Sequence, residues 1–269
     1  MKNYKLSDET KTTAWGTVLR RVVATTTFTL ACGITINAGD VGGWIEKESN
    51  LSGNAWVSDN VWVSGNAKVS DNAWVSGYAQ VSGDAKVRGN AQVSGNAVVY
   101  GDALVSDNAQ VSGYASVHGN AKVSGDARVS GDTKVYDNAQ VSDNAKVDGY
   151  AWVSDYAQIS GDARVFGDTL VSDDAQVFGK ALVFGDAEVC GNARVGNVSD
   201  YIVFKNKWPS DRHFTWTKSN DKWAEVEDGF YGTGDELIKK AYADSEASGK
   251  HYEACVKSVE TLKNVEQTE

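Results

Sequence analysis

The residue in this chain whose type and position could best support catalysis is His118. The chain contains three histidines, and His118 is the one that lies in its repetitive middle part. An imidazole can act as a general base because its pKa lies near neutrality. No acidic residue shares its register position in the repeat described below, so nothing in the pattern supplies a carboxylate to orient the ring.

Metal and disulfide chemistry are not indicated by the cysteines. Cys32, Cys190 and Cys255 are odd in number and far apart, without the spacing of a metal site. This pattern predicts reduced thiols in a cytoplasmic protein and no metal centre. A zinc site built from three histidines of the repeat is excluded, because the repeat holds one.

A six-residue repeat must position His118. Every sixth residue from Leu51 to Val195 is Val, except for Leu51 and Ile159, and a small residue, mostly Ala, follows four positions later. Side chains alternate in extended segments, so each Val and its Ala face the same side. Gly or Asp, followed mostly by Asn, Asp or Tyr, then turns the chain. Each hexad is therefore predicted to form one short strand and one corner of a solenoid.

This hexad resembles that of the hexapeptide-repeat family, whose fold is a left-handed parallel β-helix with three hexads in each triangular coil. The resemblance implies the left hand, the triangular section and eight coils for residues 51–195. In addition, "NYKLS", "VLRRVVA" and "GGWIEKESNLS" near the N-terminus are similar to the opening of YdcK-like bacterial proteins and their phage relatives.

The predicted fold class is an all-β solenoid with a cap at each end, since raw strand edges invite polymerisation. Residues 1–50 are predicted to form a β-rich N-terminal cap, with one or two strands in Thr17–Thr29. Residues 51–197 form the β-helix, and residues 198–269 form a small α+β module that is vaguely phage-like. In this module we expect hairpin strands and then two helices around Gly249, the first opened by a capping box of Thr233 and Glu236.

Residues 18 apart stack in such a solenoid, so outward side chains form columns. One face carries aromatic side chains over several coils, and a second aromatic cluster lies near the end of the repeat. Contiguous exposed apolar groups indicate a covering partner. The predicted binding surface comprises Tyr100, His118, Tyr136, Trp152, Phe166, Phe178 and Phe184.

Other columns have a structural interpretation. The tryptophans Trp56, Trp62 and Trp74, and also the second cluster, are expected to pack against the terminal segments. For the middle column, a contact between protomers or simple ladder packing stays open. Two columns lie at corners. In one, Tyr78, Tyr114 and Tyr150 recur every 36 residues, which suggests duplication of a two-coil unit. In the other, side-chain amides that begin at Asn54 are expected to form a hydrogen-bonded ladder.

Two functions stay open. The family resemblance implies an acyl-CoA-dependent acyltransferase with acetyl-CoA as cofactor and His118 as general base, although no loop interrupts the repeat to wall a substrate pocket. The preferred hypothesis is a non-catalytic scaffold, without catalytic residues or cofactor, that binds an unidentified protein. One version is a phage or prophage protein that blocks a host defence factor. If the aromatic face is inert, Trp208, Trp216 and Trp223 are the next candidates.

Charge and hydropathy limit the partners. The net charge of −10 argues against direct nucleic-acid binding, which needs a basic surface. Imitation of DNA by the acidic rod stays an alternative, as does homo-oligomerisation. No apolar run approaches the ~18 residues of a membrane span, which predicts a protein without membrane contact.

Overall fold

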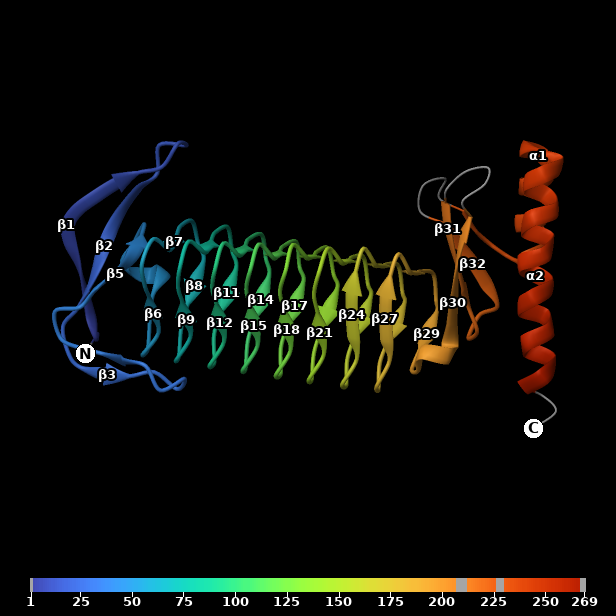
Figure 1. Ribbon diagram of the computed structural model, residues 1–269. Helices are drawn as coiled ribbons and strands as arrows, with labels where there is room; N and C mark the ends of the chain where they lie inside the picture. The colour runs from blue at the N-terminus through green and yellow to red at the C-terminus, as the bar shows by residue number, and fades with distance from the viewer. Residues whose placement is uncertain (1, 207–211, 226–229, 267–269) are drawn as a thin grey trace.

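The protein is a rod of stacked coils that carries a separate structure at each end (Figure 1). The computed structural model describes residues 2–206, 212–225 and 230–266. Within residues 51–195, all of which are described, there are 24 short strands and no helix. The predicted all-β solenoid of about eight coils is therefore confirmed, whereas the left hand of the coil stays a prediction.

Three parallel sheets form the sides of the rod, which confirms the three-sided section. Each coil contributes one strand to each sheet, and each strand pairs with the strand 18 residues later, as Gln80 pairs with Val98. We name the sides face I, face II and face III in chain order.

Face I contains β6 (Trp56–Val57), β9 (Trp74–Val75), β12 (Gln92–Val93), β15 (Gln110–Val111), β18 (Arg128–Val129), β21 (Lys146–Val147), β24 (Arg164–Gly167) and β27 (Leu182–Gly185). Face II contains β7 (Trp62–Val63), β10 (Gln80–Val81), β13 (Val98–Val99), β16 (Ser116–Val117), β19 (Lys134–Val135), β22 (Trp152–Val153), β25 (Leu170–Val171) and β28 (Glu188–Val189). Face III contains β8 (Lys68–Val69), β11 (Lys86–Val87), β14 (Leu104–Val105), β17 (Lys122–Val123), β20 (Gln140–Val141), β23 (Gln158–Ile159), β26 (Gln176–Val177) and β29 (Arg194–Val195).

The interior of the rod is filled by the Val and Ala positions of the repeat. Ala103 and Val105, for example, have no exposed surface. One large and one small apolar side chain per hexad fit the narrow space between three sheets, and burial of these rows is the main source of stability. Thr133 and Thr169 occupy the small position and are also buried.

The corners are fixed by residues with positive φ, which are Gly or Asp. Asp59 has φ of 54°, and its carboxylate accepts a hydrogen bond from the Gly77 N–H of the next coil at 3.0 Å. Glycine is required where coils touch, since a Cβ on Gly113 would lie 2.7 Å from the Gly131 carbonyl oxygen. The coils therefore stack at a fixed distance.

The predicted amide ladder is confirmed along one corner. Asn54 donates to Asn72, Asn72 to Asn90, and Asn90 to Asn108, with distances of 3.4, 3.3 and 3.0 Å between the amide nitrogen and oxygen. These bonds tie successive coils together outside the backbone ladder.

The N-terminal cap continues face II. β1 (Tyr4–Thr12) pairs with β2 (Val18–Ala24), β2 pairs with β5 (Val41–Ile45), and β5 pairs in parallel with β7 of the first coil. β3 (Phe28–Thr29) and β4 (Thr35–Ile36) form a small hairpin, and a 3₁₀ turn, η1 (Glu48–Asn50), leads into the solenoid. The strands predicted in Thr17–Thr29 are present as β2 and β3, whereas β1 was not predicted, because its sequence after Leu6 is charged and polar.

Two of the three tryptophans of the first coils, Trp56 and Trp62, contact this cap as predicted. Trp56 is 2% exposed, and its ring centroid lies 5.9 Å from that of Phe28. The Lys11 ammonium lies 4.6 Å from the Trp62 ring centroid. Trp74 packs partly against the same core and donates to the Ser58 hydroxyl at 3.1 Å.

The C-terminal module is an antiparallel sheet followed by two helices. After the 3₁₀ turn η2 (Val198–Asp200), the strands are β30 (Tyr201–Asn206), β31 (Arg212–Thr217), β32 (Lys222–Glu225) and β33 (Phe230–Gly232). The helices are α1 (Gly234–Asp244) and α2 (Glu246–Glu266). They pack on the sheet around a core of their own, which includes Trp216 and Trp223.

The predicted helix boundary was wrong. The helices divide at Ser245, whose backbone is extended and whose hydroxyl accepts from the Ser248 N–H at 3.1 Å. Gly249 lies inside α2, where a Cβ would come 2.2 Å from the Tyr242 ring. This glycine therefore permits close helix packing rather than a break. The predicted capping box is confirmed, since the Glu236 N–H donates to the Thr233 hydroxyl and the Thr233 N–H to the Glu236 carboxylate.

No helix in the described part of the chain combines the length and the apolar character needed to cross a membrane.

Candidate binding surface

The middle of face II carries a column of stacked rings. Tyr100, His118 and Tyr136 directly follow β13, β16 and β19, so the register of the sheet places them one above another. The His118 ring centroid lies 4.6 Å from that of Tyr100 and 5.2 Å from that of Tyr136, with an interplanar angle of 16° in both pairs. The predicted column therefore forms a continuous aromatic strip.

Trp152 extends this strip in the adjacent column of face II. Trp152 is 45% exposed, and the Lys134 ammonium lies 4.1 Å from its ring centroid. This cation–π contact holds the indole against the sheet. We name Tyr100, His118, Tyr136 and Trp152 the central aromatic cluster.

The surroundings of His118 favour the neutral imidazole. Partial burial lowers the pKa of His118, the Asp137 carboxylate opposes this effect, and the Lys134 ammonium adds to it. Among the described residues, no group hydrogen-bonds the His118 ring. The side chain thus contributes aromatic area between two phenols and has no oriented base arrangement.

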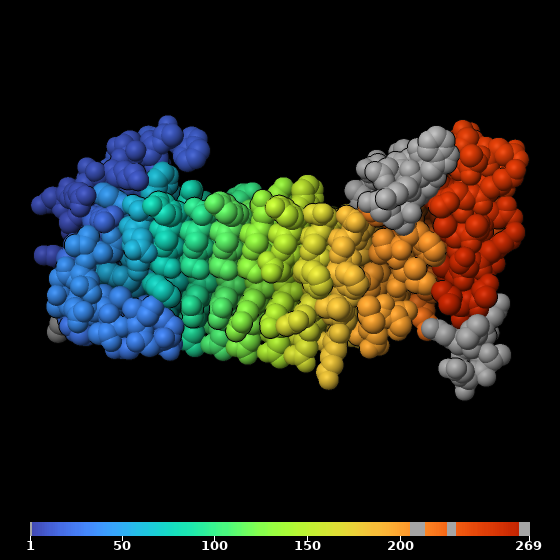
Figure 2. Space-filling view, in the orientation of Figure 1, coloured from blue at the N-terminus to red at the C-terminus, as the bar shows by residue number. Residues whose placement is uncertain are grey.

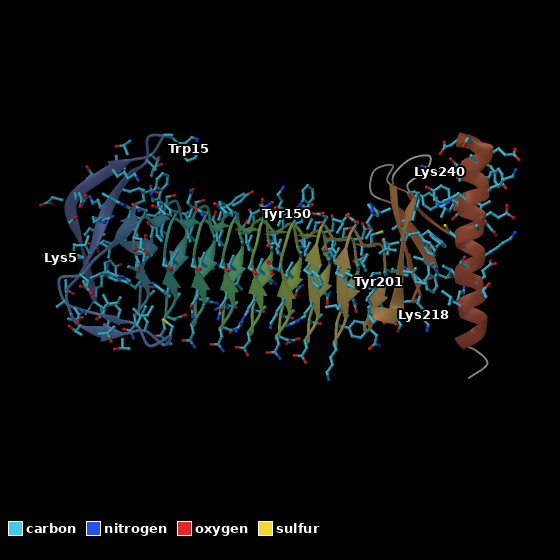
Figure 3. The ribbon with its side chains drawn as sticks, in the orientation of Figure 1. Lys5, Trp15, Tyr150, Tyr201, Lys218 and Lys240 are labelled. Carbon is cyan, nitrogen blue, oxygen red and sulfur yellow. The ribbon has the colours of Figure 1, made fainter. Side chains whose placement is uncertain are left out.

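Four further tyrosines, which were not predicted to belong to this surface, border face II. Tyr78, Tyr114 and Tyr150 lie on the corner between faces I and II, and Tyr156 lies on the corner between faces II and III. Their side chains are 61–67% exposed, and Tyr150 projects from the edge of the rod in Figure 3. Sorting the sequence by its 18-residue register would have placed them beside face II, because Tyr78, Tyr114 and Tyr150 precede its strands by two residues and Tyr156 follows one by three.

The remaining predicted residues do not join this surface. Phe166 and Phe184 lie on face I, with ring centroids 5.6 Å apart, and are 39% and 43% exposed. Phe178 lies on face III, where the Arg194 guanidinium carbon is 5.1 Å from its ring centroid. The prediction that these residues form one cluster was wrong, because consecutive hexads point to different faces.

The tail tryptophans do not form a surface either. Trp216 and Trp223 are 4% and 2% exposed and belong to the core of the C-terminal module. Trp208 lies outside the described residues.

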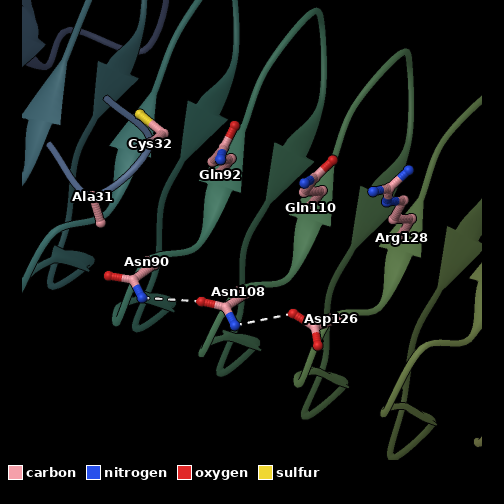
Figure 4. Close-up of a pocket in the computed structure, with 8 residues that line it drawn as sticks. All are labelled: Ala31, Cys32, Asn90, Gln92, Asn108, Gln110, Asp126 and Arg128. Atoms are coloured by element: carbon pink, nitrogen blue, oxygen red, sulfur yellow. Dashed lines mark hydrogen bonds between the residues drawn. The ribbon is translucent and has the colours of Figure 1, made fainter. Parts of the chain in front are cut away.

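Two concave regions lie where a terminal segment approaches the rod. One, of about 180 Å³, lies between the tip of the β3–β4 hairpin, at Ala31 and Cys32, and the polar side chains of face I and its corner (Figure 4). The other, of about 390 Å³, lies where the rod meets the C-terminal module, and its wall includes the pair His213 Nε2–Asp186 Oδ2 at 3.1 Å.

Metal and thiol chemistry find little support in the described residues. No three His, Cys, Asp or Glu side chains lie together there as metal ligands would. The three cysteines are free, and burial raises the pKa of Cys190 to about 12, so this thiol stays protonated.

The part of the chain that matches a known protein family lies in the repeat. Residues 91–106 and 157–173 match the family model of the YdcK β-solenoid repeat. The chain carries YdcK-type β-solenoid repeats. The first YdcK-type segment spans β12, β13 and β14 and contains Tyr100, and the second spans β23, β24 and β25. A search among curated proteins gives no match.

Proposed function

We propose that this protein is a non-catalytic scaffold that binds a protein partner through the central aromatic cluster of face II. The observation that carries the proposal is the exposure of these rings in the middle of the rod. Tyr100 and Trp152 are 39% and 45% exposed, and Figure 2 shows that the terminal segments lie at the two ends of the rod. Tyr and Trp are enriched at binding hot spots because they bury a large area at a low entropy cost.

The rigidity of the rod supports this role. The backbone at each ring of the column bonds to the next coil, as the Tyr100 N–H donates to the Val117 carbonyl at 3.0 Å and the His118 N–H to that of Val135 at 3.0 Å. The rings are therefore held in place before a partner arrives, and less conformational entropy is lost on binding.

At the same height of the rod, the other two faces carry polar and charged side chains instead of aromatic rings. Face I carries Gln92, Gln110 and Arg128, and face III carries Lys122 and Gln140. Such side chains are typical of a solvated surface and lose entropy when they are immobilised. We therefore assign the contact to face II alone.

The partner is proposed to be a host factor in the cytoplasm that the protein binds and blocks. This part of the proposal rests on the resemblance of the N-terminal segment to YdcK-like proteins of bacteria and phages. The net charge of −10 favours a partner with a neutral or basic contact surface over a nucleic acid.

The alternative is an acyltransferase that uses acetyl-CoA, and His118 is the residue that favours it. Both faces of its ring are covered by tyrosines, which leaves only the ring edge to meet a substrate. We expect thiol release from acetyl-CoA to stay at background over a panel of sugar and amine acceptors. A signal that His118→Ala abolishes would replace the scaffold proposal with this alternative.

The scaffold proposal is tested with the pair Tyr100→Ser/Tyr136→Ser. Serine occupies the same column at positions 64 and 82, so the fold should persist. The matched control, Gln92→Ser/Gln110→Ser, changes two outward residues of face I. We expect the tyrosine pair to lose a partner captured from bacterial lysate while its oligomeric mass, measured by light scattering, is unchanged.

Two results would contradict the proposal. A fall in oligomeric mass in the tyrosine variant would make face II a contact between copies of this chain. Equal partner retention by the wild type and both variants would show that the central aromatic cluster is not the contact.

A further inference from the structure

Tyr78, Tyr114 and Tyr150 form a straight row on the corner between faces I and II. Their side chains are 63%, 67% and 63% exposed, although tyrosine usually buries much of its ring. The coils between them carry Asn96 and Asp132 at the same position. The row thus alternates an exposed ring with a short hydrogen-bonding side chain.

The spacing of the row is set by the backbone. The N–H groups of Tyr78, Tyr114 and Tyr150 donate to the carbonyls of Gly95, Gly131 and Gly167, at 2.8, 2.8 and 3.0 Å. Adjacent strands lie about 4.8 Å apart, so two coils separate neighbouring tyrosines by about 9.6 Å and the row spans about 19 Å. The tight stacking of the corner glycines leaves no room to change this spacing.

A regular row of rings selects for a straight polymer with the same repeat. An extended peptide fits poorly, because its side chains return to the same side every two residues, or about 6.7 Å. Nucleic acid is disfavoured by Asp132, by Asp168 two coils further along, and by the net charge of −10. An extended β-1,4-linked glycan fits well, because its repeat is two sugar rings and is close in length to two coils.

The chemistry of the row matches such a glycan. The C–H face of every second sugar ring can pack on a tyrosine ring. The hydroxyls of the intervening sugars can hydrogen-bond to the Asn96 amide and the Asp132 carboxylate. Anionic glycans would be repelled by the aspartates, so the charge favours a neutral chain.

We propose that this tyrosine row binds a neutral, extended β-1,4-linked glycan that lies along the axis of the rod. The site shares no residue with the central aromatic cluster, although Tyr150 lies two residues before Trp152, and it does not depend on the proposed protein partner. The double variant Tyr100→Ser/Tyr136→Ser should therefore leave glycan affinity unchanged, so the two proposals can fail independently.

The direct test is calorimetric titration of the full chain with β-1,4-linked hexasaccharides of glucose and of N-acetylglucosamine. A hexasaccharide covers all three tyrosines, so it should bind at least about tenfold more tightly than the disaccharide. Tyr114→Asn removes the central platform and should weaken binding about tenfold, the equivalent of one stacking contact. Asn stands at this position in other coils, and a thermal melt checks that the fold is kept. Tyr156→Asn, on the other corner of face II, should bind as the wild type does.

The spacing itself is tested by Asn96→Tyr/Tyr114→Asn. This variant keeps three tyrosines but places them one and three coils apart, so it should bind as weakly as Tyr114→Asn. The proposal is overturned if this variant binds like the wild type, if neither hexasaccharide binds, or if an α-1,4-linked hexasaccharide, which is not straight, binds equally well.

Discussion

Some aromatic residues at the ends of the rod lie under a terminal segment, whereas those of the central aromatic cluster do not. Trp56 in the first coil and Tyr201 beside the last are 2% and 7% exposed, whereas Tyr100 and Trp152 are 39% and 45% exposed. Aromatic side chains therefore have two roles. Trp56 and Tyr201 seal the ends of the solenoid, whereas Tyr100 and Trp152 in the middle, and also Phe184 in the last coil, stay exposed.

The two ends are sealed by different bonds. At the N-terminal end, β5 continues the ladder of face II through backbone pairing with β7. At the C-terminal end, side-chain hydroxyls form hydrogen bonds with backbone N–H and C=O groups of the last coil. Thr215 accepts from the Glu188 N–H at 2.7 Å and Ser219 from the Arg194 N–H at 2.6 Å, while Tyr201 donates to the Leu182 carbonyl at 3.1 Å. Both arrangements cover edges that would otherwise pair with another chain.

The largest effect should come from Trp56→Ala. This change empties the buried site beneath Phe28 and should lower the free energy of unfolding by about 3–5 kcal/mol. The matched change Trp152→Ala removes an exposed ring and its contact with Lys134, and should cost about 0.5–1 kcal/mol. Urea unfolding followed by circular dichroism measures both. Similar losses in the two variants would contradict the distinction between end and middle.

A smaller effect is expected for Tyr201→Phe. The hydroxyl of Tyr201 bonds the Leu182 carbonyl and accepts from the Phe184 N–H, so its removal should lower stability by about 1 kcal/mol. Amide hydrogen exchange at Phe184 should become faster. Tyr156→Phe, which alters an exposed hydroxyl, is the control and should change neither quantity.

Acidic pH should weaken the C-terminal module. Hydrogen bonds from Thr233 lower the pKa of Glu236, and contacts with Lys257 and then Tyr242 lower that of Glu253. A carboxyl with a lowered pKa stabilises the fold above its ordinary value of 4.5, and this contribution is lost as the pH falls through its folded pKa. The helical circular dichroism signal should therefore melt at a lower temperature near pH 3.5 than at pH 6.

The variant Glu236→Gln is the control for this effect. It should lower the melting temperature of the helices at pH 6 and reduce the dependence on pH. A helical signal that melts at the same temperature at both pH values would contradict this account of the module.

The rod could be predicted from the sequence because the pattern that determines it lies within six residues and is repeated along the chain. A Val and an Ala in each hexad determine which side chains face inward, and the 18-residue register of three hexads then places Tyr100, His118 and Tyr136 in one column. The capping box of Thr233 and Glu236 was also predictable, since it depends on residues three apart.

The remaining features depend on contacts between distant segments. β1 is a strand because β2 supplies its partner, although its own sequence is charged and irregular. Gly249 resembled a helix break, yet its role is to accommodate the Tyr242 ring. Similarly, Phe178 was grouped with Phe166 and Phe184 from nearness in sequence, whereas the corners of the solenoid direct it to another face.

Hydroxyl-radical footprinting with mass spectrometry tests the central claim most directly, because it measures the exposure of each ring in the free and the bound protein. In the free chain, Tyr100, Tyr136 and Trp152 should be modified much faster than Trp56 and Tyr201. In the complex with the captured partner, modification of Tyr100, Tyr136 and Trp152 should slow while that of Phe166 and Phe184 on face I is unchanged. Equal modification of end and middle rings in the free chain, or unchanged modification of the central aromatic cluster in the complex, would contradict the account.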